Sequence, residues 1–235
     1  MKKAVCLISG GLDSCVTAYI AKKKGFEIYA LTFKYGQRHE KEINCAKQIA
    51  LSVNAKKHII FNIDLNIFGG SSLTDLKIEP EIDHDVKEIG KKIPSTYVPA
   101  RNTVFLSVAL AYAETIQADA IFIGATCADY SGYPDCRPIY FKAFQKLTDI
   151  ATKATIQGKK IKILTPLLNL SKSDIIKKGL TLKVSFEKTW SCYQGGKKAC
   201  GRCDSCILRL KGFKEANSKD PIDYSFIPYW YLFIL

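Results

Sequence analysis

The glycine pair at positions 10 and 11 constrains the fold of this chain more than any other feature of its sequence. An apolar run over residues 4–9 precedes the pair, and a helical pattern over residues 13–24 follows it. Glycines let a backbone turn sharply and approach a ligand closely. The start of a helix attracts anions through its open amides and its dipole. We therefore expect a strand, a phosphate-binding turn and a helix at the beginning of an α/β domain.

Apolar periodicity along the rest of the chain predicts further strands and helices in alternation. Strands are predicted over residues 4–9, 28–33, 57–63, 120–124 and 161–164, and helices over 13–24, 40–53, 103–117 and 139–156, with a short helix after Ser171. This order predicts a doubly wound parallel five-stranded sheet with helices on both faces. The polar, turn-rich residues 65–99 are predicted to form a functional loop.

The composition bounds the class of protein. Of 235 residues, 47% are hydrophobic, which is enough for a sizeable core. The net charge of +13 favours polyanionic partners. Alternatively, the lysines are solvated charges at helix ends, and without a basic run interleaved with aromatics we do not expect nucleic acid as a partner. No apolar stretch reaches the roughly 20 residues of a membrane span, and no secretory signal is evident, so we expect a cytoplasmic protein.

The sequence Ser-Gly-Gly-Leu-Asp-Ser at 9–14 suits a nucleotide phosphate but matches neither of two common nucleotide-binding motifs. The Gly-Lys-Ser/Thr ending of a Walker A loop and the Gly-x-Gly-x-x-Gly of a dinucleotide fold are both missing. Asp13 would repel a bare phosphate, so we interpret it as a residue on the Mg²⁺ side of bound ATP. A glycine turn without a ligand is the alternative. The predicted ATP-binding residues are Ile8, Ser9, Gly10, Gly11, Leu12, Asp13, Ser14, Cys15, Val16, Thr17 and Ala18.

Four of the nine cysteines are spaced as metal ligands, with seven, two and two residues between them. Four thiolates and no open position indicate a structural zinc ion. An iron–sulfur cluster is the rival interpretation, but the Cys-Pro that usually ends such a run is absent. We interpret Cys6, Cys15, Cys45 and Cys127 as small core residues. The predicted zinc ligands are Cys192, Cys200, Cys203 and Cys206.

The glycine loop resembles the SGGxDS pyrophosphate loop (PP-loop) of the ATP-pyrophosphatase superfamily, whose domains have an adenine nucleotide alpha hydrolase-like fold. Four further segments narrow the resemblance from the superfamily to one family. They are residues 35–39 with Glu42, residues 97–102, residues 129–137 and residues 192–206. Together these motifs resemble the 7-cyano-7-deazaguanine synthase family of the queuosine pathway. The resemblance extends from the N-terminus to about Tyr224.

The resemblance implies a ligase reaction in which 7-carboxy-7-deazaguanine, ammonia and ATP give the nitrile 7-cyano-7-deazaguanine, AMP and diphosphate. It implies adenylated intermediates, an amide and two ATP per product. Free ammonia is the expected nitrogen source, and a homodimer is compatible with the family. A PP-loop enzyme that acts directly on tRNA, by thiolation or amino-acid attachment, is the nearest alternative. A zinc-ribbon nucleic-acid binder without catalysis and an inactive homologue are the others.

A further set of candidate roles concerns the phosphates and the proton transfers. Arg101 would stabilise charge on the α phosphate, or would form a salt bridge at a helix start, while Asn102 would cap that helix. His39 would handle protons during amide formation or serve a structural role. Glu42, three residues further on, would orient His39 or bind Mg²⁺.

Candidate substrate residues lie in the segment 129–137. Asp129 and Asp135 would accept hydrogen bonds from a guanine-like base, Arg137 would pair with the substrate carboxylate, and the rings of Tyr130 and Tyr133 would stack on the base. Alternatively, these residues only shape their loop. For the whole chain we expect an ATP-binding domain over residues 1–185, a zinc lobe over 186–223 and an uncharged apolar tail over 224–235, packed on the core or on a partner subunit.

Overall fold

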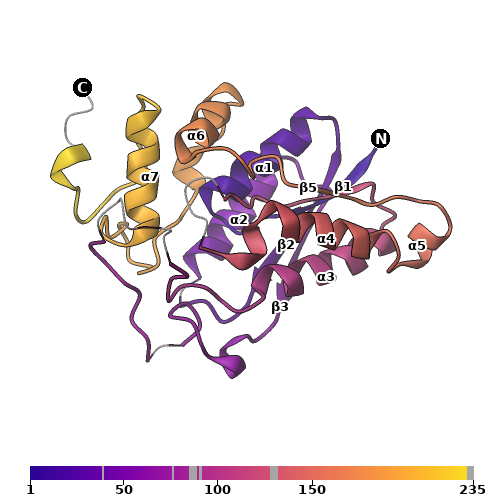
Figure 1. Cartoon of the computed structure of the whole chain (residues 1–235). Helices are drawn as coiled ribbons and strands as arrows, with labels where there is room; N and C mark the ends of the chain where they lie inside the picture. Colours follow the sequence, from indigo (N-terminus) through magenta and orange to yellow (C-terminus); the bar gives the residue numbers. More distant parts are fainter. Residues whose placement is uncertain (39, 76, 85–88, 90–91, 128–131, 232–235) are drawn as a thin grey trace.

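The sheet has five parallel strands in the order β3-β2-β1-β4-β5. In the computed structural model (Figure 1), the described residues are all except 39, 76, 85–88, 90–91, 128–131 and 232–235. This sheet confirms the predicted fold class, with strand ends within two residues of the predictions. The strands are β1 (Lys3–Leu7), β2 (Glu27–Lys34), β3 (Lys57–Asn62), β4 (Ala120–Phe122) and β5 (Lys162–Leu164).

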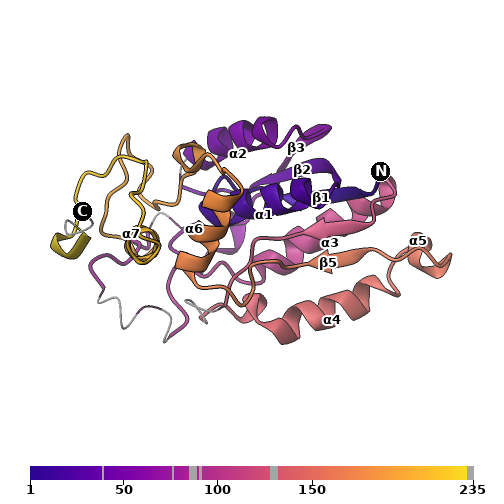
Figure 2. The same ribbon diagram turned by 90° about the horizontal axis from the view of Figure 1, so that it is seen from above.

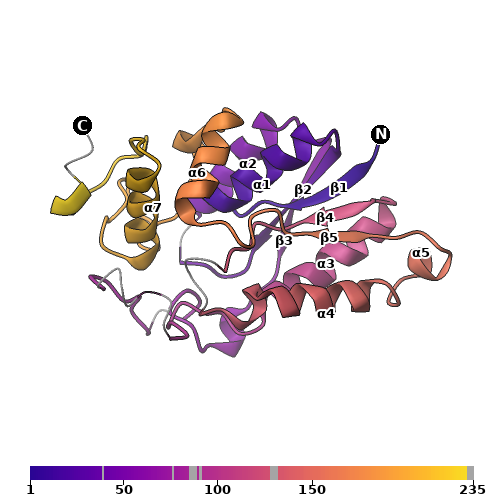
Figure 3. The same cartoon turned by 45° about the horizontal axis from the view of Figure 1, so that its top comes forward.

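Helices cover both faces of the sheet. Figures 2 and 3 show α1, α2 and α6 on one face and α3 and α4 on the other. The helices are α1 (Leu12–Lys23), α2 (Lys41–Ser52), α3 (Arg101–Thr115), α4 (Pro138–Thr148), α5 (Lys153–Ile156), α6 (Lys172–Thr181) and α7 (Asp204–Glu215). The 3₁₀ turns are η1 (Asn66–Phe68), η2 (Pro134–Cys136), η3 (Phe186–Lys188) and η4 (Tyr229–Tyr231).

Alternate residues of β1 belong to two separate cores. Ala4 and Cys6 are buried with residues of α1, α2 and α6, whereas Val5 and Leu7 are buried with residues of α3 and α4. A strand buried on both sides is typical of a parallel sheet between two helical layers. The two cores fix the central strand, and the glycine turn that follows it is therefore held in place on both sides.

The predicted helix over residues 139–156 is wrong as a single element, because the structure divides it into α4 and α5. Thr152 starts the second helix: its hydroxyl accepts a hydrogen bond from the Thr155 amide, and the Thr155 hydroxyl lies 3.3 Å from the Thr152 amide. This capping box competes with continuation of the first helix. Asn102 is also not the cap of α3, since Ala100 occupies that position with a φ of 53°.

Helix α7 was not predicted, because the cysteine spacing conceals its periodicity. Its buried side includes Cys206, Leu210 and Phe213. The chain that follows α7 returns along it, as Figure 1 shows, and Tyr231 near its end is buried. Among the described helices none is long and apolar enough to cross a membrane.

Candidate active site

A cavity of about 330 Å³ lies where the chain changes direction across the sheet, beyond the carboxyl ends of β1 and β4. In open α/β sheets this switch point is where ligands bind. Its lining comes from several elements: the glycine loop, the residues after β4, the start of α3, the first residue of α6 and the segment 190–193. The sheet therefore brings residues that are far apart in sequence to one site.

The glycine loop forms one wall of the cavity. Its two serine hydroxyls lie 3.0 Å apart, and the Ser9 hydroxyl accepts the Gly11 amide at 3.2 Å. Gly11 is the N-cap of α1, and no side chain caps the first turn, as an anion site requires. Of the predicted ATP-binding residues, Ile8, Ser9, Gly11, Leu12, Asp13 and Ser14 line the cavity. Gly10 shapes the turn, and Cys15, Val16, Thr17 and Ala18 are buried in α1 behind it.

Two glycines permit the close approach of other segments to this loop. Gly10 has a φ of 93°, and a Cβ there would lie 2.1 Å from the carbonyl oxygen of Glu42. Gly124 follows β4, and a Cβ there would lie 2.9 Å from the backbone of Asp13. The first turn of α1 is thus packed tightly between β4 and the start of α2.

Lys172 was missed by the sequence analysis, although it contacts the loop directly. Its Nζ donates to both carboxylate oxygens of Asp13, at 2.7 and 2.8 Å, and both side chains are mostly buried. Lys172 is the first residue of α6, where the helix dipole disfavours a cation. A lysine at this unfavourable position was the sequence signal that could have pointed to a role for Lys172. The pair places a positive charge and a carboxylate together beside the glycine loop.

Arg101 and Glu42 also line this cavity. Arg101 donates to the Tyr35 hydroxyl at 3.3 Å, and none of the salt bridges among the described residues involves it. Burial raises the pKa of Glu42 to about 7, although the positive charge of Arg101 opposes the shift. The carboxyl group therefore exchanges a proton near neutral pH.

Aromatic rings form another wall of the cavity, beside Arg101, whose guanidinium lies over the Tyr35 ring. Phe33 and Phe105 stack with their ring centroids 3.9 Å apart and their planes 1° from parallel. Tyr133 also lines the cavity, and its hydroxyl lies 3.0 Å from the Thr96 hydroxyl. Phe105 was not singled out in the sequence. Rings in this arrangement suit a planar heterocycle.

Two other predicted substrate residues, Asp135 and Arg137, do not line the cavity. The Asp135 carboxylate is buried and accepts the Asn102 amide at 3.0 Å, so it holds the start of α3. The Arg137 side chain is exposed and donates to the Pro134 carbonyl at 3.1 Å. His39, Asp129 and Tyr130 lie outside the described residues.

The four predicted metal ligands come together in a second cluster. The sulfurs of Cys192, Cys200, Cys203 and Cys206 all lie within 4.8 Å of one another, and those of Cys200 and Cys206 are 3.9 Å apart. A tetrahedral zinc–thiolate site with bonds of about 2.3 Å places its sulfurs about 3.8 Å apart. Backbone amides of Arg202 and Cys203 donate to the Cys200 sulfur at 3.4 and 3.3 Å. The donor set and its spacing fit a zinc ion.

Comparison with known proteins identifies relatives over nearly the whole length. The family model described as "Queuosine biosynthesis protein QueC" matches residues 3–217. A 7-cyano-7-deazaguanine synthase of Thermosynechococcus vestitus is 51% identical over 97% of both chains. Another, of Picrophilus torridus, is 53% identical over 98% of this chain and 95% of its own. The NMN synthetase structure of Francisella tularensis matches with a TM-score of 0.49 and 17% identity, over 93% of this chain and 78% of that one.

Proposed function

Since this chain belongs to the QueC family of queuosine biosynthesis proteins, we propose that it makes 7-cyano-7-deazaguanine from 7-carboxy-7-deazaguanine and ammonia, with ATP as the activating substrate. One observation carries the proposal: the glycine loop, a charged Asp–Lys pair and a wall of aromatic rings line a single cavity. An ATP and a planar acceptor placed there would meet at the α phosphate.

The chemistry requires activation because a carboxylate has no leaving group. Attack of the substrate carboxylate on the α phosphorus gives an acyl-adenylate and diphosphate. Ammonia then displaces AMP and loses a proton to give the amide. The amide oxygen attacks the α phosphorus of a second ATP and expels diphosphate, and the adenylated amide then loses AMP and the two protons of its nitrogen to leave the nitrile. The same loop would serve both adenylations.

We assign the phosphate end to α1 and to Lys172. The amides of the first turn of α1, which no side chain caps, would bind the anion, and the Lys172 ammonium would follow the departing diphosphate. Mg²⁺ would accompany ATP and neutralise phosphate charge, with the Asp13 carboxylate as its hard oxygen ligand. Because Lys172 holds that carboxylate at 2.7 and 2.8 Å, Asp13 is already oriented toward the cavity.

We assign the acceptor end to the aromatic wall, Arg101 and Glu42. Phe33, Phe105 and Tyr133 would stack on the heterocycle. The Arg101 guanidinium would stabilise the charge that develops on the α phosphate. With its pKa near 7, Glu42 would take the proton released when ammonium becomes a nucleophile. Asp129, Tyr130 and His39 keep the roles proposed from the sequence, and we assign Asp135 to holding α3.

We further propose that the cysteine cluster holds one structural zinc ion. Its four thiolates leave no open position for a substrate, and three of the four sulfurs belong to fully buried side chains or nearly so. The ion would then stabilise the lobe that we place at residues 186–223, and would take no part in the chemistry.

The test is product analysis by mass spectrometry. Purified protein is incubated with 7-carboxy-7-deazaguanine, ATP, Mg²⁺ and ammonium, and we expect the nitrile with about two AMP per product. Asp13→Asn and Lys172→Met should each lower turnover by about 10²-fold or more, since each removes a charge at the phosphates. Lys153→Met is the matched control, because Lys153 is also the first residue of a helix but is exposed and remote from the cavity.

Two outcomes would overturn the proposal. No AMP release that depends on the deazaguanine carboxylate would exclude the reaction. Turnover that requires tRNA, with tight and salt-sensitive tRNA binding, would favour the enzyme acting directly on tRNA, which the net charge of +13 also suits.

A further inference from the structure

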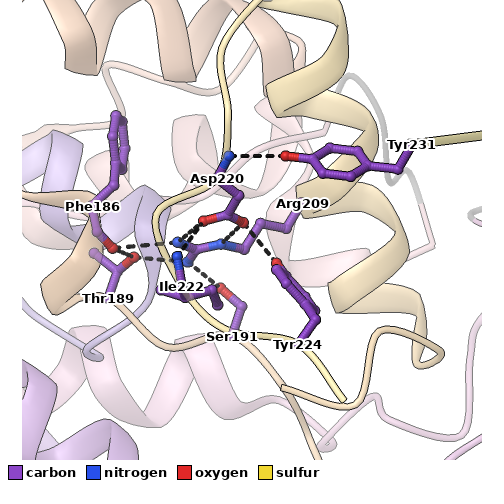
Figure 4. A network of polar contacts seen from close by, with 8 residues as sticks. All are labelled: Phe186, Thr189, Ser191, Arg209, Asp220, Ile222, Tyr224 and Tyr231. Atoms are coloured by element: carbon purple, nitrogen blue, oxygen red, sulfur yellow. Dashed lines mark hydrogen bonds and ion pairs between the residues drawn. The ribbon is translucent and has the colours of Figure 1, made fainter. Parts of the chain in front are cut away.

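A buried ion pair joins helix α7 to the C-terminal segment of the chain. Arg209 donates from Nε and Nη2 to the two carboxylate oxygens of Asp220, at 2.7 and 2.9 Å (Figure 4). The two side chains are 2% and 1% exposed. A hydrophobic pair of similar volume often stabilises a fold equally well. We therefore explain this buried ion pair by the segments that it holds in position.

The remaining donors of Arg209 bind the segment that precedes the cysteine cluster. Nη1 donates to the Thr189 hydroxyl at 2.7 Å and to the Ser191 hydroxyl at 3.4 Å, and Nη2 donates to the Phe186 carbonyl at 3.3 Å (Figure 4). A guanidinium has five N–H donors. Five acceptors are therefore matched to five donors, and Arg209 has no N–H left for a phosphate although it lines the cavity.

This segment also contacts the glycine loop. The Trp190 amide donates to the Gly10 carbonyl at 2.9 Å. Trp190 and Ser191 both line the cavity. Arg209 donates to Thr189 and Ser191, the residues directly before and after Trp190. A path of hydrogen bonds thus runs from Asp220 through Arg209 and the segment 189–191 to the backbone of the loop.

The path continues into the apolar tail. The Tyr231 hydroxyl accepts the Asp220 amide at 2.9 Å, and the Tyr224 hydroxyl donates to the Asp220 carboxylate at 2.6 Å (Figure 4). Tyr231 is buried in the same core as α1. The tail therefore orients the carboxylate that orients Arg209.

We propose that Arg209 and Asp220 are positioning residues that set the conformation of the glycine loop through Trp190, with Tyr231 as the outer support of the pair. This inference rests on the proposed use of the cavity for ATP. Loss of the pair should weaken the productive binding of ATP much more than the binding of the deazaguanine carboxylate, because the aromatic wall is built on other elements.

The experiment uses Trp190 as a local reporter. Trp190 and Trp230 are the two tryptophans, so a Trp230→Phe background leaves fluorescence from Trp190 alone. In that background we expect ATP with Mg²⁺ to change the emission. Asp220→Asn and Thr189→Val should raise the ATP concentration needed for that change, and the KM for ATP, by about 10-fold. The KM for the carboxylate substrate should stay within about twofold.

Two further variants complete the test. Tyr231→Phe removes one hydroxyl and should give a smaller shift in the same direction, which keeps the test open if Asp220→Asn fails to fold. Lys211→Met is the control, because Lys211 belongs to an exposed pair on the same helix. Folded variants whose ATP response and KM for ATP match the background protein would overturn the inference. Absence of any ATP response in the background protein would instead count against the proposed function.

Discussion

Gly10→Ala tests whether the turn and the start of α2 are as tightly packed as the structure has them. An added Cβ would lie 2.1 Å from the Glu42 carbonyl oxygen, whereas such contacts essentially never fall under 3.0 Å. The two backbones must separate by at least the difference, about 1 Å. The backbone at Gly10 also has a φ of 93°, which costs a residue with a Cβ about 1–2 kcal/mol.

The two contributions can be separated with a matched control. Gly158 has a φ of 86°, and a Cβ there would meet nothing within 4 Å. Gly158→Ala should therefore show the backbone strain alone, about 1–2 kcal/mol in the free energy of unfolding. Gly10→Ala should lose more stability than the control. A displacement of about 1 Å near reacting groups can lower a rate by about 10²-fold, so we also expect a large loss of turnover from Gly10→Ala alone.

Urea unfolding measures the first effect, and AMP release at saturating acceptor measures the second. The reasoning about the loop is refuted if both alanine variants lose the same stability and both keep wild-type turnover. A stability loss without a turnover loss at Gly10 would mean that the loop tolerates the displacement, and would remove the structural reason for assigning it to ATP.

Two other perturbations test the site. Burial raises the pKa of Glu42 to about 7 from its usual 4.5, so wild-type stability should fall as the pH rises through that window. The stability advantage of Glu42→Gln should therefore grow by about 3 kcal/mol between pH 4.5 and pH 8 in urea unfolding, and an advantage independent of pH would contradict this. Cys203→Ser should abolish zinc binding in metal analysis and lower the unfolding temperature, whereas Cys45→Ser, beside the cluster but outside it, should keep one zinc per chain. Iron in the wild-type protein would exclude zinc.

The sheet was predictable because its strands are short apolar runs separated by turn residues, and each strand follows a predicted helix or turn. The glycine loop and the four cysteines were predictable because their chemistry depends on spacing within a few residues. Helix α7 was not, since the cysteine spacing at its start conceals the helical spacing of Ile207, Leu210 and Phe213.

The site features that the sequence did not predict depend on contacts between distant segments. Lys172 lies 159 positions after Asp13 in the sequence, and no motif around Lys172 predicts the contact between them. Asp135 was expected at the substrate because a carboxylate can accept hydrogen bonds from the N–H groups of a guanine-like base. Only the packing of η2 against α3 turns that carboxylate toward the Asn102 amide. Spacing predicts local chemistry, whereas the partners of a side chain depend on how the layers pack.

The cysteine cluster and the Arg209–Asp220 pair connect the same parts of the chain. Cys192 follows Ser191 directly, while Cys203 and Cys206 lie at the start of α7, the helix that carries Arg209. A zinc ion would therefore join the segment 189–192 to α7 at one point, and Arg209 joins them again through Thr189. Because both links hold the segment whose Trp190 amide binds the Gly10 carbonyl, a zinc ion in the cysteine cluster would also influence the glycine loop. Two links to one segment should not act independently, so the effects of removing the metal and of Asp220→Asn on the KM for ATP should not simply add.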